Sequence, residues 1–213
     1  MPKTTETTDG WQIDPKNITN FKADDFELEL MILFWVLAAG KNGVTASNCL
    51  RKMLTYWAAK ITIALPYPGN ENFTPFDVIR FILDEGVDLA QEMKQFGIGC
   101  FNNKAKTFKV LVESNLNLKT CSVDDLEKVP GIGNKSSRCF LIHSRPNQVY
   151  AGLDRHVLAY MRDQGHSVPK STPTGKKYKE IEQQFINIVT SQGRTIADLD
   201  LEIWNSYRSR FKK

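Results

Sequence analysis

The stretch VPGIGNKSS, residues 129–137, decides the local fold of this chain and contains a lysine in an unusual setting. It follows the short helical segment VDDLEK and runs directly into the helical segment RCFLIHS. A proline and two glycines between two helices predict a very tight hairpin over about residues 122–143. Gly131 and Gly133 permit positive φ angles and allow the backbone to lie close to another surface.

The backbone N–H groups of this hairpin could form a phosphate-binding site. Its N–H groups at Gly131, Ile132 and Gly133 precede a helix N-terminus, where unpaired amides and the helix dipole favour an anion. The alternative is an ordinary connection between two helices, because Pro-Gly turns are common.

Lys135 falls in the first turn of the second helix of the hairpin. The positive end of the helix dipole disfavours an ammonium ion there, and partial burial would also lower its pKa. We therefore predict a lysine with a lowered pKa, available as a neutral nucleophile. The alternative is an exposed lysine that contacts a phosphate.

Asp154 follows nineteen residues later, in the stretch GLDRH, at the expected N-cap of the next helix. Capping alone would explain it and contributes about 1 kcal/mol. A carboxylate and an activated lysine that enter one cleft from two helix starts would instead form a nucleophile and its electrostatic partner. The sequence leaves both interpretations open.

The rest of the chain indicates an all-α protein with about nine or ten helices and a frayed polar tail over residues 1–10. No segment shows sustained apolar–polar alternation. Pro75 is expected at the first position of its helix, and Ser122 and Asp125 are expected to form a capping box. The expected helices lie near residues 24–39, 44–61, 75–85, 88–96, 102–116, 123–129, 135–144, 155–165, 176–193 and 196–210.

Composition narrows the class of protein. The 213 residues are 41% hydrophobic and 24% charged, as in a globular protein. The net charge of +4 is compatible with a polyanionic partner but does not require one, and by itself it indicates only a slightly basic soluble protein. No apolar run reaches the length of a membrane span, and we expect an intracellular protein. The four cysteines have no metal-ligand spacing, so no metal site is predicted; they are Cys49, Cys100, Cys121 and Cys139.

The motifs LEKVPGIGNKSSRCFLI and VYAGLDRHVL together resemble the helix-hairpin-helix DNA glycosylases. FGIGCFNNKAKTFKVLV is similar to a further family helix, and the likeness spans roughly residues 25–165. A lysine at the position of Lys135 is typical of the family's bifunctional glycosylase/AP lyases. The resemblance implies one unit over residues 11–213, made of two packed helical lobes with the active site in the cleft between them.

Within that family the chain looks most like the small archaeal-type 8-oxoguanine DNA glycosylases. The resemblance implies that Lys135 attacks a damaged nucleotide, that Asp154 stabilises the developing charge, and that the strand is then nicked. Those enzymes end in a basic residue that helps to recognise the base, and Lys213 occupies that place. It further implies a monomer, associated with DNA, that binds duplex DNA containing a damaged base and needs no cofactor.

Other candidates are less specific. Lys41 and Asn42, in the turn after the first core helix, could fill the gap left by an extruded nucleotide, or simply form an exposed turn. Trp204 and Phe211 could stack on the extruded base, although Trp204 has the helical spacing of a core residue. His156 is interpreted as a structural histidine in preference to one that orients the active-site loop.

The sequence leaves two other functions open. The same fold could excise a different damaged or mismatched base. A non-catalytic DNA-binding protein could use the hairpin only as a phosphate clamp, although such a clamp needs the glycines but neither Lys135 nor Asp154.

Overall fold

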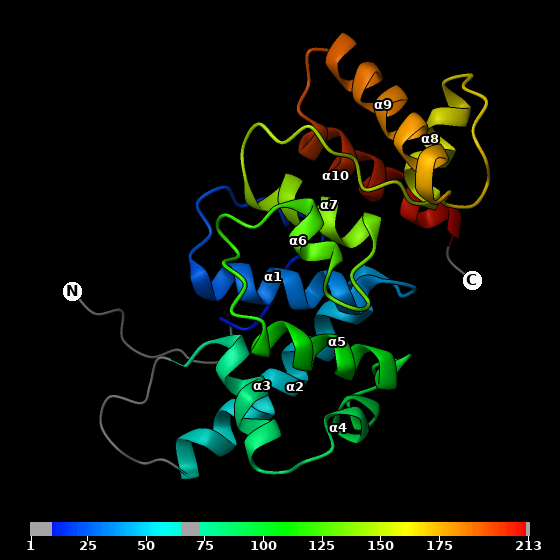
Figure 1. Cartoon of the computed structure of the whole chain (residues 1–213). Helices are drawn as coiled ribbons and strands as arrows, with labels where there is room; N and C mark the ends of the chain where they lie inside the picture. Colours follow the sequence, from blue (N-terminus) through cyan, green and yellow to red (C-terminus); the bar gives the residue numbers. More distant parts are fainter. Residues whose placement is uncertain (1–9, 65–72, 212–213) are drawn as a thin grey trace. The chain divides into compact units, whose positions relative to one another are not determined.

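The computed structural model describes residues 10–64 and 73–211, which form helices joined by turns and loops, with no strand in these ranges (Figure 1). The all-α prediction is therefore confirmed. The predicted N-terminal tail lies almost wholly outside the described residues. The helices are α1 (Asp25–Ala38), α2 (Gly43–Ala64), α3 (Pro75–Asp84), α4 (Leu89–Gln95), α5 (Phe101–Glu113), α6 (Val123–Glu127), α7 (Asn134–Ser144), α8 (Arg155–Asp163), α9 (Gly175–Ser191), α10 (Ile196–Tyr207) and the 3-10 helix η1 (Arg208–Phe211).

The chain divides into two compact units, each built from segments that are distant in sequence. Of the described residues, unit 1 comprises 10–15, 24–64, 73–121 and 129–131, and unit 2 comprises 16–23, 122–128 and 132–211. The hairpin loop thus contributes to unit 1, whereas both helices of the hairpin belong to unit 2.

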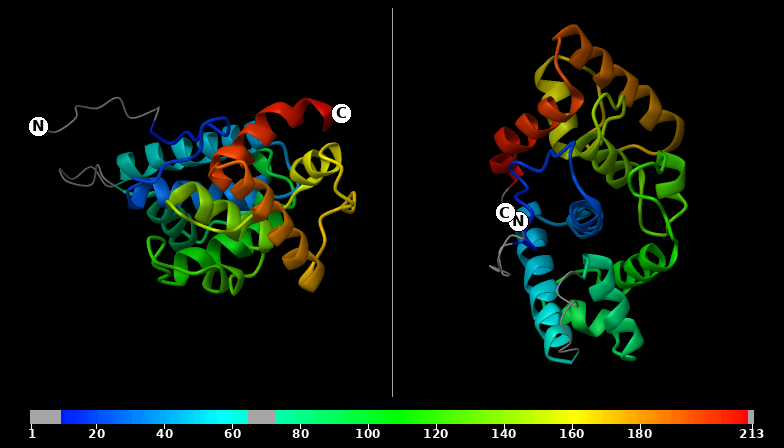
Figure 2. Two further views of the ribbon diagram at one scale, coloured as in Figure 1. Left: turned by 90° about the horizontal axis from the view of Figure 1, so that it is seen from above. Right: turned by 90° about the vertical axis from the view of Figure 1, so that its left-hand side faces the viewer.

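Helix α1 is the centre of unit 1. Asp24 caps it by accepting a hydrogen bond from the Glu27 amide, and the Glu27 side chain accepts one from the Asp24 amide. The helix is buried on nearly all of its circumference and contacts α2, α3 and α5. The right-hand view of Figure 2 looks nearly along α1 and shows α2 from the side, crossing next to it. An apolar run with an acidic start therefore forms the predicted central helix.

A buried lysine closes the C-terminal end of α1. The Lys104 ammonium, on α5, donates a hydrogen bond of 2.8 Å to the carbonyl of Leu37. The last carbonyls of a helix have no partner within the helix, so a buried cation there satisfies one of them. Burial lowers the pKa of Lys104, and the neighbouring charge of Lys41 lowers it further.

Unit 2 packs α8, α9 and α10 around an apolar core. Its centre includes the fully buried Leu153, Leu158, Tyr178 and Phe185. Helix α10 contacts α7, α8 and α9 and so joins the hairpin helix to the rest of the unit. The two helix starts that carry Lys135 and Asp154 therefore lie in one packed body.

The C-terminal end departs from the prediction of one helix over residues 196–210. Helix α10 ends at Tyr207, and the chain tightens into η1. The Asp163 carboxylate accepts hydrogen bonds from both the Tyr207 hydroxyl, at 2.8 Å, and Arg210, at 2.6 Å. A tightened last turn of this kind is common at helix ends.

Among the described residues, none of the helices combines the length and the apolar character that crossing a membrane requires.

Replacing Leu33 in α1 by alanine tests the centre of unit 1. Leu33 is completely buried, so we expect Leu33→Ala to lower the free energy of unfolding by about 2–5 kcal/mol. Ile63→Ala is the matched control, because Ile63 is 79% exposed and should cost little. Urea unfolding measures both. Equal losses would show that α1 does not form the core of unit 1.

Candidate active site

The predicted hairpin is present as α6 and α7. Ser122 and Asp125 form the predicted capping box at the start of α6, where the Ser122 side chain accepts from the Asp125 amide and the Asp125 side chain accepts from the Ser122 amide. Five residues separate the C-cap Lys128 from the first residue of α7. The prediction of a tight connection is therefore confirmed.

The two hairpin glycines have different roles. Gly131 has φ +94°, and a Cβ there would lie 2.1 Å from the Thr107 hydroxyl oxygen. That hydroxyl donates a hydrogen bond of 2.7 Å to the Pro130 carbonyl. Gly133 is the N-cap of α7 with φ −100°, and a Cβ there would meet nothing within 4 Å. The positive φ that both glycines permit thus occurs at Gly131, which also lies against Thr107 of α5, and not at Gly133.

Folding brings the two catalytic candidates together. The Nζ of Lys135, in the first turn of α7, lies 2.8 Å from Oδ2 of Asp154, the N-cap of α8. The other carboxylate oxygen, Oδ1, accepts from the backbone N–H groups of His156 at 2.8 Å and Val157 at 3.1 Å. One oxygen therefore caps α8 and the other pairs with the lysine, so the two interpretations of Asp154 are compatible.

Gly152 allows this approach. A Cβ at Gly152 would lie 2.2 Å from the sulfur of Cys139, which is on α7 one turn after Lys135. Only a glycine lets the segment before α8 lie directly on α7. Because Gly152 has no side chain, the segment GLD lies close enough to α7 for Asp154 to reach Lys135.

The charges of the pair shift both pKa values. Burial lowers the pKa of Lys135, but the Asp154 charge and hydrogen bond outweigh burial and hold it above its usual range. Burial raises the pKa of Asp154, and Lys135 together with His156 more than reverses this. The prediction of a lowered lysine pKa is therefore wrong, because it included the helix dipole and burial but not a carboxylate at 2.8 Å.

Lys135 is the more exposed side chain of the pair. It keeps 34% of its side chain exposed, whereas Asp154 keeps 14%.

His156 and the C-terminal segment complete the surroundings of Asp154. The buried His156 places Nδ1 3.1 Å from Oδ2 of Asp154. The Phe211 ring stands edge-on to the His156 ring with 5.0 Å between centroids, and the Arg155 guanidinium lies 4.9 Å from the Phe211 ring. Phe211 is thus brought to the site, an arrangement that no local sequence pattern indicates.

The other predicted residues have separate surroundings. Trp204 is only partly buried and lies 5.2 Å from the Arg208 guanidinium, so its assignment to the core is wrong. Lys213 lies outside the described residues. In unit 1, the Asn42 side chain accepts from the Val44 amide at the start of α2, and Lys41 donates to the Gly97 carbonyl at 2.5 Å. Their role as wedge residues stays a prediction.

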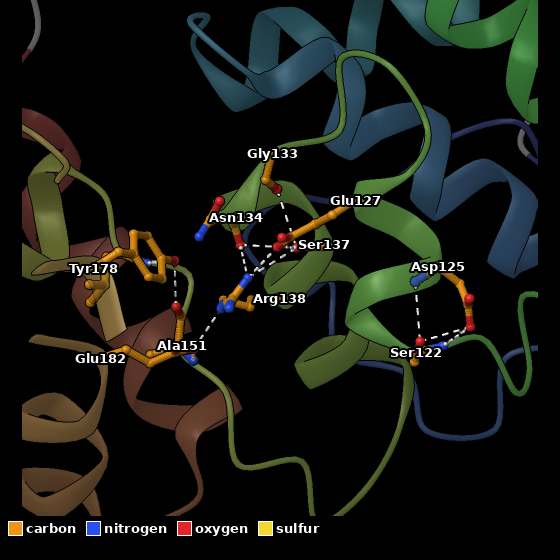
Figure 3. A network of polar contacts seen from close by, with 11 residues as sticks. Ser122, Asp125, Glu127, Gly133, Asn134, Ser137, Arg138, Ala151, Tyr178 and Glu182 are labelled. Carbon is orange, nitrogen blue, oxygen red and sulfur yellow. Dashed lines mark hydrogen bonds and ion pairs between the residues drawn. The ribbon is translucent and has the colours of Figure 1, made fainter. Parts of the chain in front are cut away.

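Sequence reasoning missed the ion pairs that support the hairpin. Arg138, one turn after Lys135, is buried between two carboxylates: it pairs with Glu127 of α6 and, at 2.6 Å, with Glu182 of α9. Figure 3 shows Arg138 between these two helices. An arginine in the middle of the apolar stretch SSRCFLI was the available signal, because a buried charge requires a partner.

Comparison with known proteins supports the resemblance found in the motifs. No family model matches the chain. A curated 8-oxoguanine DNA glycosylase/AP lyase of Methanocaldococcus jannaschii is 29% identical over 128 residues, which cover 55% of this chain and 61% of that protein. The crystal structure of the M. jannaschii 8-oxoguanine glycosylase/lyase, in complex with a 15mer DNA containing 8-oxoguanine, matches with a TM-score of 0.57 and 21% identity over 93% of this chain and 89% of that one.

The chain has the fold of an 8-oxoguanine glycosylase/lyase. The predicted resemblance to the archaeal-type glycosylases is thereby confirmed. The curated match spans less than two thirds of its relative, so the likeness establishes the fold and leaves the activity to be argued from the site.

Alanine at each hairpin glycine separates their roles. Gly131→Ala should lower the free energy of unfolding by about 1–3 kcal/mol, because it combines a positive φ with a contact on Thr107. Gly133→Ala should change it by less than about 1 kcal/mol, since the N-cap geometry suits other residues. Urea unfolding gives both values. Losses of the same size would contradict the assignment of the close approach to Gly131 alone.

Proposed function

We propose that this chain is a bifunctional DNA glycosylase/AP lyase that removes an oxidised base, 8-oxoguanine, from duplex DNA and then nicks the strand. The observation that carries the proposal is the 2.8 Å pair of Lys135 and Asp154 at two helix starts in a glycosylase fold. A lysine is the side chain that forms a Schiff base with a sugar carbon, and a carboxylate beside it stabilises positive charge that develops there.

The first chemical step exchanges one bond for another at C1′ of the damaged nucleotide. Lys135 loses one proton, and its nitrogen then forms a bond to C1′ while the glycosidic bond breaks and its electron pair leaves with the base. The departing base gains one proton, so the step is balanced without a further reactant. While Lys135 is protonated, Lys135 and His156 hold the pKa of Asp154 below its usual range, so the carboxylate enters the reaction ionised.

The second step opens the sugar. The C1′–O4′ bond breaks as the Lys135 nitrogen gives up one proton and O4′ gains one, which leaves a protonated imine between Lys135 and C1′. A proton then leaves C2′, and the C3′–O3′ bond breaks with the phosphate as the leaving group. Water then hydrolyses the imine and restores the lysine. Each step uses the amine of Lys135, whereas Asp154 contributes charge and position.

Recognition of DNA requires contacts besides the catalytic pair. Extruding a nucleotide from the duplex costs a few kcal/mol, and phosphate contacts hold the strand without reading its sequence. We assign the phosphate contact to the backbone N–H groups of Gly131, Ile132 and Gly133. The aromatic rings of Trp204 and Phe211 and the cation of Lys213 are the candidates for contact with the extruded base, because flipped bases stack on aromatic side chains.

Borohydride trapping tests the nucleophile. Wild-type protein should give a covalent adduct with a duplex carrying one 8-oxoguanine opposite cytosine, and Lys135→Gln should give none while its Kd for the duplex stays within a few-fold. Lys177→Gln is the matched control, because Lys177 is 61% exposed on α9 and pairs with Glu180, so its adduct should form normally.

The other possible outcomes of the trapping experiment would point to a different function. Adduct formed only with an abasic-site duplex would support the lyase chemistry on another base. Duplex binding without an adduct on any substrate would contradict the proposal and favour a non-catalytic phosphate clamp.

The pH dependence of trapping tests the role of Asp154. Because Asp154 raises the pKa of Lys135, the neutral amine is scarce at neutral pH, and cyanoborohydride trapping at an abasic-site duplex should keep accelerating as the pH rises into the alkaline range. Asp154→Asn removes the largest of the raising charges and leaves burial, which lowers the pKa. Its trapping should therefore level off at a lower pH.

The same variant should remove 8-oxoguanine about 100-fold more slowly, because charge stabilisation in the transition state is lost. An unchanged pH profile in Asp154→Asn would show that the carboxylate does not control the protonation of Lys135.

A further inference from the structure

The segment that carries Asp154 is a tight turn immediately before α8. In this turn the Leu153 amide donates a hydrogen bond of 3.0 Å to the Ala151 carbonyl. Asp154 follows directly with extended backbone, φ −132° and ψ −176°, and then caps α8. The position of its carboxylate therefore depends on α8 on one side and on this turn on the other.

The hydroxyl group of Tyr178 makes hydrogen bonds to both ends of this turn. Tyr178, on α9, donates to the Ala151 carbonyl at 2.7 Å and accepts from the Leu153 amide at 3.0 Å. The residue is completely buried, and burial raises the pKa of its phenol, so the hydroxyl stays protonated and can donate. Phenylalanine would fill the same volume, which leaves the two backbone contacts as the specific role of the hydroxyl.

Glu182 holds the same turn one helical turn further along α9. Its Oε1 accepts from the Ala151 amide at 3.0 Å and from Nε of Arg138 at 2.6 Å. Arg138 lies on α7 one turn after Lys135, and its guanidinium is 5.0 Å from the Tyr178 ring. Figure 3 shows Tyr178 and Glu182 reaching Ala151 from α9, with Arg138 on the other side of Glu182.

These contacts join the two catalytic candidates through a third helix. Helix α9 binds the turn that precedes Asp154 and, through Glu182 and Arg138, the helix that carries Lys135. Buried polar groups of this kind fix geometry closely, since every displacement leaves one of them unpaired. Nζ of Lys135 and Oδ2 of Asp154 are 2.8 Å apart. A shift of about 1 Å between two reacting groups is enough to slow catalysis.

We propose that Tyr178 and Glu182 are positioning residues that set the distance between Asp154 and Lys135 by clamping the 151–153 turn to α9. The proposal rests on the proposed function for its catalytic consequence, but the distance itself can be tested without activity.

Tyr178→Phe tests the clamp in the full-length protein. We expect removal of 8-oxoguanine under single-turnover conditions to slow by about 10- to 100-fold, with Kd for the duplex unchanged. Phe185→Leu is the matched control, because Phe185 is a buried core residue of α9 with no polar contact to the turn. It should lower thermal stability with excision within a few-fold of wild type.

The pH profile distinguishes positioning from general destabilisation. The charged or titratable groups that act on Lys135 are Asp154 before α8, Cys139 on α7 and Asp200 on α10. Of these three groups, only Asp154 is attached to the turn that Tyr178 holds. Abasic-site trapping by Tyr178→Phe should therefore level off at a lower pH than trapping by wild type or Phe185→Leu. Glu182→Gln, which keeps an acceptor for Ala151, should retain more activity than Glu182→Ala.

A readout independent of catalysis completes the test. Nitrogen-15 NMR of the lysine ammonium groups, with the Lys135 signal assigned through Lys135→Gln, should show faster hydrogen exchange at Lys135 in Tyr178→Phe than in Phe185→Leu. Equal exchange and equal pH profiles in the two variants would overturn the positioning role. Faster exchange together with a wild-type protein that forms no adduct on any duplex would support positioning and contradict the proposed function.

Discussion

The candidate site in unit 2 depends on one ion pair, between an ammonium and a carboxylate held 2.8 Å apart at the starts of α7 and α8. A helix start is unfavourable for Lys135 and favourable for Asp154, because both face the positive end of a helix dipole. Asp154 compensates for the unfavourable position of the lysine and caps its own helix with its second oxygen. Neither group could be buried at this place without the other.

The backbone has to come unusually close for this pair to form. The segment before α8 lies on α7 where Gly152 leaves room for the Cys139 sulfur. Hydrogen bonds from α9 then hold the turn before Asp154. The pair is thus positioned by the missing side chain of Gly152 and by buried polar contacts at the turn.

The ion pair also defines the chemical problem that the site has to solve. A lysine paired with a carboxylate is protonated and cannot attack, so a proton must leave before the reaction starts. In the proposed reaction, the same carboxylate would stabilise the positive charge that develops on the sugar. A phosphate clamp would need neither of these two side chains.

The sequence by itself determined the features that depend on neighbouring residues: the all-helical class, the capping box at Ser122, the tight hairpin, and the places of Lys135 and Asp154 at two helix starts. Only the tertiary structure decided that the lysine pKa is raised, that Gly133 needs no positive φ, that Phe211 lies against His156, and that Tyr178 holds the turn before Asp154. These features join residues from about twenty to over fifty positions apart, or depend on what packs against them, so no local pattern contains them.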